Sequence, residues 1–147
     1  MKILVQRVNS AEVIIKNKVY NKINKGYCVF LGIKKNDTEK DIEYLINKIL
    51  KIGLFENKNK KGYFCESIKE INGEILVISQ FTLYGDFKKG KKPSFTHAMN
   101  SENAQKLYCK FIEKLKEKYS KVKQGKFAAY MEVKLKNDGP ATFLLES

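Results

Sequence analysis

The chain has 147 residues and a mass of 17.0 kDa, which is the size of one compact domain. Hydrophobic residues make up 43% of it and aromatic residues 12%, so the composition excludes a chain that is disordered throughout. The formal net charge is +13, which favours an anionic partner. A lysine-rich composition is the other explanation of the charge, since Arg7 is the only arginine.

Neither export nor a membrane span is expected. No apolar run reaches the roughly 18 residues that a membrane helix needs, and the first six residues lack the layout of a signal peptide. Cys28, Cys65 and Cys109 are widely spaced and form no Cys-x-x-Cys pair, which indicates reduced thiols rather than disulfides or a zinc site. No linker or repeat divides the chain. We therefore predict one cytoplasmic domain, residues 1–147.

The first half of the chain predicts three strands and one helix. β-branched and aromatic residues dominate residues 2–8, 11–16 and 27–33. A cap at residues 36–38 then precedes an amphipathic helix. Its apolar stripe consists of Ile42, Leu45, Ile46, Ile49 and Leu50.

In the second half we expect a polar turn at residues 57–62 and an apolar strand at 74–79, buried on both faces. A basic loop at 88–93 leads to a second helix that begins near Asn100 or Ser101. The buried stripe of that helix is predicted to be Ala104, Leu107, Tyr108, Phe111, Ile112, Leu115 and Tyr119.

Strands at 130–136 and 141–145, separated by residues 137–140, close the chain. The fold class is α+β: a single domain with a twisted, mixed and mostly antiparallel β-sheet, barrel-like, and two long amphipathic helices.

The sequence contains few of the residues and motifs that conventional catalytic sites use. His97 is the only histidine, so any nucleophile–histidine pair must use it, although a lone histidine near a loop is more often structural. No ligand cluster has metal spacing, and no glycine-rich phosphate loop is present. We expect neither a metal nor a cofactor.

Two segments stand out. At the end of the apolar strand, Ser79-Gln80-Phe81-Thr82-Leu83 brings two hydroxyls and an amide together. Rigid strand ends can present such groups to a ligand, and a locally bonded turn is the alternative. The second segment is Asn137-Asp138-Gly139-Pro140-Ala141-Thr142, where Gly-Pro indicates unusual backbone geometry; an ordinary hairpin turn is the alternative.

Together these segments resemble the D-aminoacyl-tRNA deacylases, enzymes that hydrolyse D-amino acids from mischarged tRNA. The likeness covers essentially the whole chain and includes Gln6-Arg7-Val8, Leu31-Gly32, Pro93-Ser94-Phe95 and Gly125-Lys126-Phe127-Ala128. Ala141 departs from the valine that more often follows Gly-Pro in the family. A sister family of tRNA deacylases replaces the Ser and Phe of the first segment, and this chain keeps both.

The resemblance implies a two-fold homodimer with active sites at the subunit junction. Ser79, Gln80, Phe81 and Thr82 would line the catalytic pocket for the aminoacyl group and the 3′-terminal adenosine. Gly139 and Pro140 match a Gly-cis-Pro motif that enters the partner's pocket and rejects L-aminoacyl groups. The supporting residues would be Arg7, which holds that loop, and Phe127 near the adenosine.

The implied activity is ester hydrolysis of D-aminoacyl-tRNA, and of glycyl-tRNA mischarged on tRNA(Ala). An aminoacyl ester is already activated, so its hydrolysis needs positioning and backbone N–H donors for the oxyanion more than a strong base. Water assisted by the ribose 2′-hydroxyl and a Thr82 nucleophile are the competing mechanisms. We expect the acceptor stem to contact Lys88, Lys89, Lys91 and Lys92, unless these form only a solvated surface.

Three other functions remain open from the sequence. The first is a non-catalytic tRNA-binding module of the same fold, and the second is an editing deacylase for an L-aminoacyl-tRNA. A general esterase is the third, although no nucleophile–histidine pair is apparent.

Overall fold

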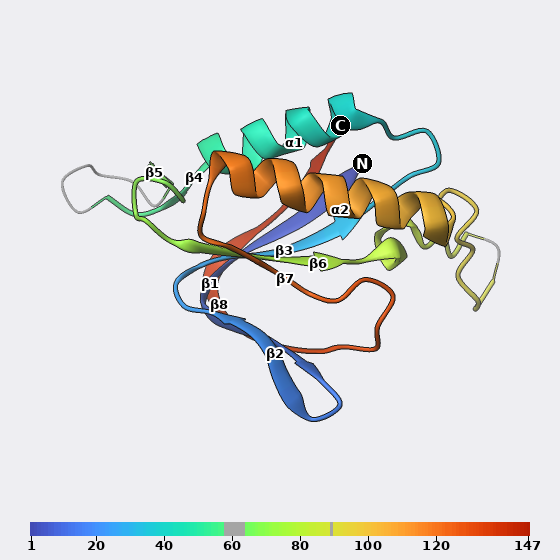
Figure 1. Ribbon diagram of the computed structural model, residues 1–147, viewed down its shortest axis with the longest axis horizontal. Helices are drawn as coiled ribbons and strands as arrows, with labels where there is room; N and C mark the ends of the chain where they lie inside the picture. Colours follow the sequence, from blue (N-terminus) through green and yellow to red (C-terminus); the bar gives the residue numbers. More distant parts are fainter. Residues whose placement is uncertain (58–63, 89) are drawn as a thin grey trace.

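The computed structural model describes residues 1–57, 64–88 and 90–147, and every structural statement below refers to these residues. A mixed β-sheet carries two helices on one face (Figure 1). The strand order is β2-β1-β3-β6-β7, with β8 paired along β1. These strands are β1 (Lys2–Ile15), β2 (Lys18–Ile23), β3 (Gly26–Gly32), β6 (Glu74–Ser79), β7 (Val122–Gln124) and β8 (Glu132–Glu146).

The sheet is mixed and curls toward closure. β1 pairs antiparallel with β2, β3 and β8, whereas β3–β6 and β6–β7 are parallel. The two ends of the strand order meet: Asn21 Nδ2 donates to the Gln124 carbonyl at 2.6 Å, and Lys123 Nζ donates to the Lys22 carbonyl at 2.6 Å. The expected barrel-like α+β fold is confirmed.

Two parallel helices, α1 (Glu39–Lys51) and α2 (Ser101–Lys118), lie side by side on the sheet (Figure 1). Both begin where the sequence predicts a cap. The Thr38 N–H and hydroxyl both donate to Asp41 Oδ2, at 2.7 and 3.0 Å, and the Asn103 N–H donates to Asn100 Oδ1 at 3.0 Å. Within the described ranges, neither helix is long and apolar enough to cross a membrane.

Apolar residues pack on both faces of the sheet. Ile75 and Val77 of β6 join the core beneath the helices, while Leu76 and Ile78 join a smaller core on the other face. All four side chains are buried, as predicted for this strand. β6 is therefore a rigid central element, and its carboxyl end is fixed from both sides.

Several predicted boundaries are wrong. The predicted strands at 2–8 and 11–16 form one strand, β1, which ends at Ile15, because Asn9 and Ser10 stay extended beside β8. The predicted strands at 130–136 and 141–145 are likewise one strand, β8, which begins only at Glu132. The sequence reading missed β2, β7 and the short pair β4 (Gly53–Phe55) and β5 (Glu66–Ser67), because these strands are short or largely solvent-exposed. Residues 58–62 of the predicted polar turn lie outside the described residues.

Candidate functional site

Ser79, Gln80, Phe81 and Thr82 lie where β6 ends and the short 3₁₀ helix η1 (Phe81–Tyr84) begins. The Gln80 N–H donates to the Leu31 carbonyl at 2.7 Å, which fixes the start of η1 against β3. Phe81 is 58% exposed, and its ring meets the edge of Phe95 at 4.9 Å between centroids. A large aromatic side chain is thus held at the surface next to two hydroxyls.

Hydrogen-bond donors converge at this segment. Gln80 Nε2 donates to Thr82 Oγ1. In the part of the chain that the structure describes, the amide N–H groups of Phe81 and Thr82 donate to no backbone carbonyl, as usual in a first helical turn. These two donors are therefore available to a negatively charged oxygen.

Gly32 permits this arrangement. A Cβ atom at Gly32 would lie 3.1 Å from the Gln80 carbonyl oxygen and 3.1 Å from Leu83 Cβ, tighter than ordinary contact. Only glycine lets η1 approach β3 this closely. The sequence signal for this close approach is Leu31-Gly32, which is part of the family likeness.

The loop between β7 and β8 lies next to the same strand end. The Gly125 N–H donates to the Val77 carbonyl at 2.9 Å, and Tyr108 Oη donates to that carbonyl at 3.0 Å. Phe127 is partly buried, with its ring centroid 5.5 Å from that of Tyr108. Phe127 is thus fixed two residues beyond Gly125, which is itself anchored beside β6.

Gly139 and Pro140 lie in a bulge of β8, and the peptide bond between them is cis. Gln6 faces Thr142 and Val8 faces Asn137, so one residue of β1, Arg7, lies opposite four residues of β8, 138–141. β8 runs antiparallel to β1 both before and after the bulge. The alternative of an ordinary hairpin turn is therefore wrong, and both residues protrude exposed from a continuous strand.

Side chains of β1 hold both ends of the bulge. Arg7 Nε lies 3.0 Å from Asp138 Oδ2 and donates to the Asp138 carbonyl at 3.1 Å, while Arg7 Nη1 donates to the Leu54 carbonyl at 2.5 Å. Gln6 Nε2 donates to Asn137 Oδ1 at 3.4 Å and to Thr142 Oγ1 at 3.3 Å. The sequence suggested Arg7 through the family likeness alone; Gln6 was overlooked as a clamp.

Within one chain the two motifs are far apart. β6 and β8 are separated by β3 and β1, which makes three strand spacings, or about 14 Å. Ser79 is level with Ile3 through Leu31, whereas the bulge begins beyond Gln6, a further rise of about 10 Å. The bulge of a chain therefore does not reach its own Ser79–Thr82 segment.

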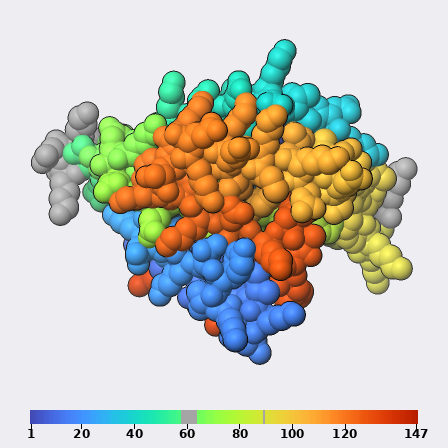
Figure 2. Space-filling model, in the orientation of Figure 1, coloured from blue at the N-terminus to red at the C-terminus, as the bar shows by residue number. Residues whose placement is uncertain are grey.

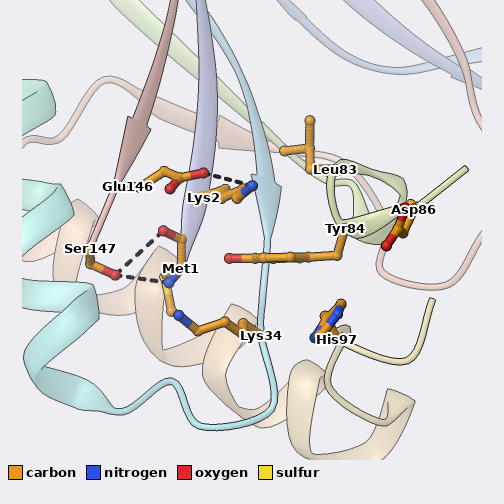
Figure 3. Close-up of a pocket in the computed structure, with 10 residues that line it drawn as sticks. Met1, Lys2, Lys34, Leu83, Tyr84, Asp86, His97, Glu146 and Ser147 are labelled. Carbon is orange, nitrogen blue, oxygen red and sulfur yellow. Dashed lines mark hydrogen bonds and ion pairs between the residues drawn. The ribbon is translucent and has the colours of Figure 1, made fainter. Parts of the chain in front are cut away.

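His97 lies elsewhere. It lines a hollow of about 320 Å³ with Leu83, Tyr84 and the chain ends, and none of residues 79–82 contributes to that lining (Figure 3). Tyr84 lies in this hollow with Lys2 Nζ 5.1 Å from its ring centroid, and burial raises the pKa of its hydroxyl. Lys88, Lys91 and Lys92 are exposed, and Lys89 lies outside the described residues.

Comparison with known proteins places this geometry in a family. The family model of D-Tyr-tRNA(Tyr) deacylase matches residues 4–146. The chain belongs to this family. It is 51% identical to the D-aminoacyl-tRNA deacylase of Thermosipho melanesiensis and 49% identical to that of Clostridium tetani, covering all of this chain and 97% of each relative. The chain is therefore an enzyme of a family that acts on aminoacyl-tRNA, as the resemblance implied.

Solved structures agree on the fold. A structure named c-Myc DNA Unwinding Element Binding Protein is 43% identical, with a TM-score of 0.94 over 100% of this chain and 99% of that one. A probable eukaryotic D-amino acid tRNA deacylase shares 16% identity and a TM-score of 0.85, covering 99% of this chain and 98% of that one. The second likeness bears on the fold alone.

Proposed function

We propose that the chain hydrolyses the ester of D-aminoacyl-tRNA, and of glycyl-tRNA mischarged on tRNA(Ala), in a pocket completed by a second copy. One subunit supplies Ser79, Gln80, Phe81 and Thr82, and the partner subunit's Gly139 and Pro140 close the pocket. The distance between the two motifs within one chain is the observation that carries this proposal. Arg7 fixes the bulge at a position from which it does not reach the Ser79–Thr82 segment of its own chain. This position fits a role in the pocket of another subunit.

A two-fold axis serves both pockets at once. In an isologous dimer each bulge enters the other subunit's site by the same contacts, so a single geometry completes two active sites. Both Gly139 and Pro140 are exposed, so their backbone carbonyls are free to face a ligand outside their own chain. The bulge is clamped at both ends, which suits a rigid steric filter.

Chiral selection then follows from main-chain atoms. A carbonyl placed against the α-carbon of the substrate clashes with an L side chain, whereas a D side chain points outward. The backbone carbonyls contact only the groups at the α-carbon and not the rest of the side chain, so many D-amino acids are accepted. Glycine has no side chain to reject, which is why glycyl-tRNA is included.

The chemistry needs donors more than a strong base. The Phe81 and Thr82 N–H groups are positioned to stabilise the oxyanion of an attacked ester, and one such donor is worth about 10²–10³ in rate in other enzymes. Thr82 Oγ1 accepts a hydrogen bond from Gln80, and no described base lies within hydrogen-bond reach of it. We therefore rank water assisted by the substrate's 2′-hydroxyl above a Thr82 nucleophile.

Paired D-Tyr-tRNA and L-Tyr-tRNA test the proposal. Purified protein with EDTA present is expected to release only D-tyrosine, and to release glycine from Gly-tRNA(Ala). Release of L-tyrosine at a similar rate would point to an editing deacylase for L-esters. Binding of tRNA without release of either amino acid would point to a non-catalytic module.

A further inference from the structure

A groove separates the β1–β2 turn from the loop between β7 and β8. Its volume is about 420 Å³, and its lining includes the apolar side chains of Ile15 and Ala129 as well as Lys16 and Lys126. Tyr130 stands at its edge and is 95% exposed, while Phe87, the next most exposed large apolar residue described, is 64% exposed. A tyrosine ring this free of protein contacts leaves both faces open to a ligand.

Both walls of the groove are tight turns. Lys16 and Asn17 have φ values of 49° and 61°, and Ala128 has a φ of 57°. The Ala129 N–H donates to the Lys126 carbonyl at 3.3 Å. Figure 2 shows the orange-red segment of the β7–β8 loop at the surface beside the blue β1–β2 hairpin. Backbone turns on both sides thus set the position of the side chains that line the groove.

The charge of the groove is positive. Its one carboxylate, Glu132, forms an exposed ion pair with Lys134, with 3.3 Å between Nζ and Oε1. None of the ion pairs among the residues that the structure describes involves Lys16 or Lys126. An apolar floor with an open aromatic ring and two free ammonium groups matches a nucleotide, which has a flat base and an anionic phosphate.

The loop that forms one wall of the groove is anchored beside the candidate active site, although none of residues 79–82 lines the groove itself. Gly125, at the start of the loop, is anchored beside Val77 of β6, two residues before Ser79. Met131 follows Tyr130 and packs against Gly125, where a Cβ atom would lie 2.8 Å from Met131 Sδ. Figure 1 places this loop at the end of the sheet where β6 ends. With the last adenosine of a tRNA in the proposed pocket, this loop offers a path for the nucleotide that precedes it.

We propose that Tyr130 stacks on the base of the nucleotide that precedes the terminal adenosine of aminoacyl-tRNA, with Lys16 and Lys126 close to its phosphates. This inference rests on the proposed function and adds a second nucleotide site to it. Stacking on an exposed aromatic ring tolerates any base and adds affinity without reading sequence.

Two substrates distinguish the second nucleotide site at Tyr130 from the proposed hydrolytic function. D-Tyr-tRNA contains the preceding nucleotide, whereas 3′-O-D-tyrosyl adenosine does not. Replacing Tyr130 by alanine is expected to raise the KM for D-Tyr-tRNA by about 5- to 150-fold, the range typical of one base–aromatic stack. The KM for the adenosine ester and kcat for both substrates are expected to stay unchanged, and Tyr130→Phe to restore the wild-type KM.

Tyr44→Ala is the matched control, because Tyr44 is also exposed and lies beside Lys48 on α1. It should change neither KM. Equal KM values for wild type and Tyr130→Ala on D-Tyr-tRNA would overturn the inference, as would an equal rise for both substrates. A lower apparent mass of Tyr130→Ala than of the wild-type protein in size-exclusion chromatography would also overturn the inference. It would mean that the Tyr130 ring contacts a second copy of the chain rather than a nucleotide. If wild-type protein hydrolyses neither substrate, the proposed function itself fails.

Discussion

Arg7 of β1 and Asp138 of β8 form an ion pair with 3.0 Å between Nε and Oδ2, directly before Gly139. The arginine side chain is buried, and its Nη1 atom also donates to the Leu54 carbonyl of β4. One side chain therefore links the bulge to two other elements of the fold. This link fixes where Gly139 and Pro140 protrude, and the proposed chiral filter depends on that position.

Arg7→Lys is expected to weaken both stability and chiral selection. Lysine keeps the charge but cannot bond Leu54 and Asp138 at once, since it lacks the planar fork of a guanidinium. We expect the free energy of unfolding to fall by about 2–4 kcal/mol, and the ratio of D- to L-Tyr-tRNA hydrolysis to fall as well. Urea unfolding and paired hydrolysis assays measure the two effects.

Lys2→Gln provides the matched control for Arg7→Lys. Lys2 also joins β1 to β8, through Glu146 at 2.7 Å, but both side chains are more exposed than those of Arg7 and Asp138. Exposed pairs contribute about 1 kcal/mol or less. An unchanged D-to-L ratio in Arg7→Lys, despite lower stability, would contradict a role of Arg7 in selection.

Gly139→Ala separates a role in folding from a role in the site. Within its own chain the new methyl group would meet only Asn137 Nδ2, at 3.1 Å, which is the end of a movable side chain. We expect the free energy of unfolding to change by less than about 1 kcal/mol. In the proposed dimer the methyl group enters the partner's pocket, so hydrolysis of D-Tyr-tRNA and Gly-tRNA should fall together. A variant with normal stability and full activity on both esters would argue against screening by the bulge.

Thr82→Val distinguishes the two mechanisms of ester hydrolysis. Valine keeps the shape of threonine but removes the hydroxyl that accepts from Gln80. With water as the nucleophile, we expect kcat for D-Tyr-tRNA to fall by less than about 100-fold, since the backbone donors remain. A substrate whose terminal adenosine lacks the 2′-hydroxyl should lose far more. Complete loss with Thr82→Val and full activity on the 2′-deoxy substrate would establish the threonine mechanism.

The sequence predicted the parts of the fold that local patterns determine. The apolar residues from Ile42 to Leu50 repeat at helical spacing after a Thr38 cap, so α1 could be located from the sequence alone. The continuous apolar run of β6 likewise predicted that this strand is buried on both faces. β2 could not be found this way. Its side chains are mostly exposed, and it exists because β1 offers an edge to pair with.

In the candidate site, too, local sequence patterns determine some features, whereas others depend on distant strands. Gly-Pro marks a special backbone in any reading, but whether it turns the chain or bulges from a strand depends on β1, whose register with β8 continues on both sides of it. The clamp of Gln6 on Asn137 and Thr142 joins residues more than 130 positions apart. No local pattern encodes such a contact, and the distance between the two motifs likewise follows only from the strand order.

The cap of α1 predicts a pH dependence of stability. Burial opposes ionisation of Asp41, but hydrogen bonds from the Thr38 N–H, the Ser147 hydroxyl and the Thr38 hydroxyl outweigh it and lower its pKa to about 2. Because the folded pKa lies below the unfolded value, this carboxylate stabilises the fold above pH 4 and loses its effect as the pH falls toward 2. Asp41→Asn should cost about 1 kcal/mol at pH 7 and almost nothing at pH 2. Urea unfolding of both proteins at the two pH values tests this, and an equal difference at both would refute it.

Replacing Lys88, Lys91 and Lys92 by glutamine tests whether the basic loop contacts tRNA. These three side chains are exposed, and the segment that carries them follows η1 at the end of the sheet where β6 ends (Figure 1). Each phosphate contact that is lost lowers the slope of log affinity against log salt by about 0.7–0.9. We therefore expect KM for D-Tyr-tRNA to rise and its salt dependence to flatten, with kcat unchanged.

The matched control replaces Lys40, Lys48 and Lys51 of α1, which removes the same charge from exposed positions on the helical layer. If the net charge of +13 attracts tRNA only as a whole, both triple variants will change KM equally. If the loop makes specific contacts, only its own variant will flatten the salt dependence. If the loop variant leaves the slope of log affinity against log salt unchanged, the acceptor stem binds to another surface of the protein.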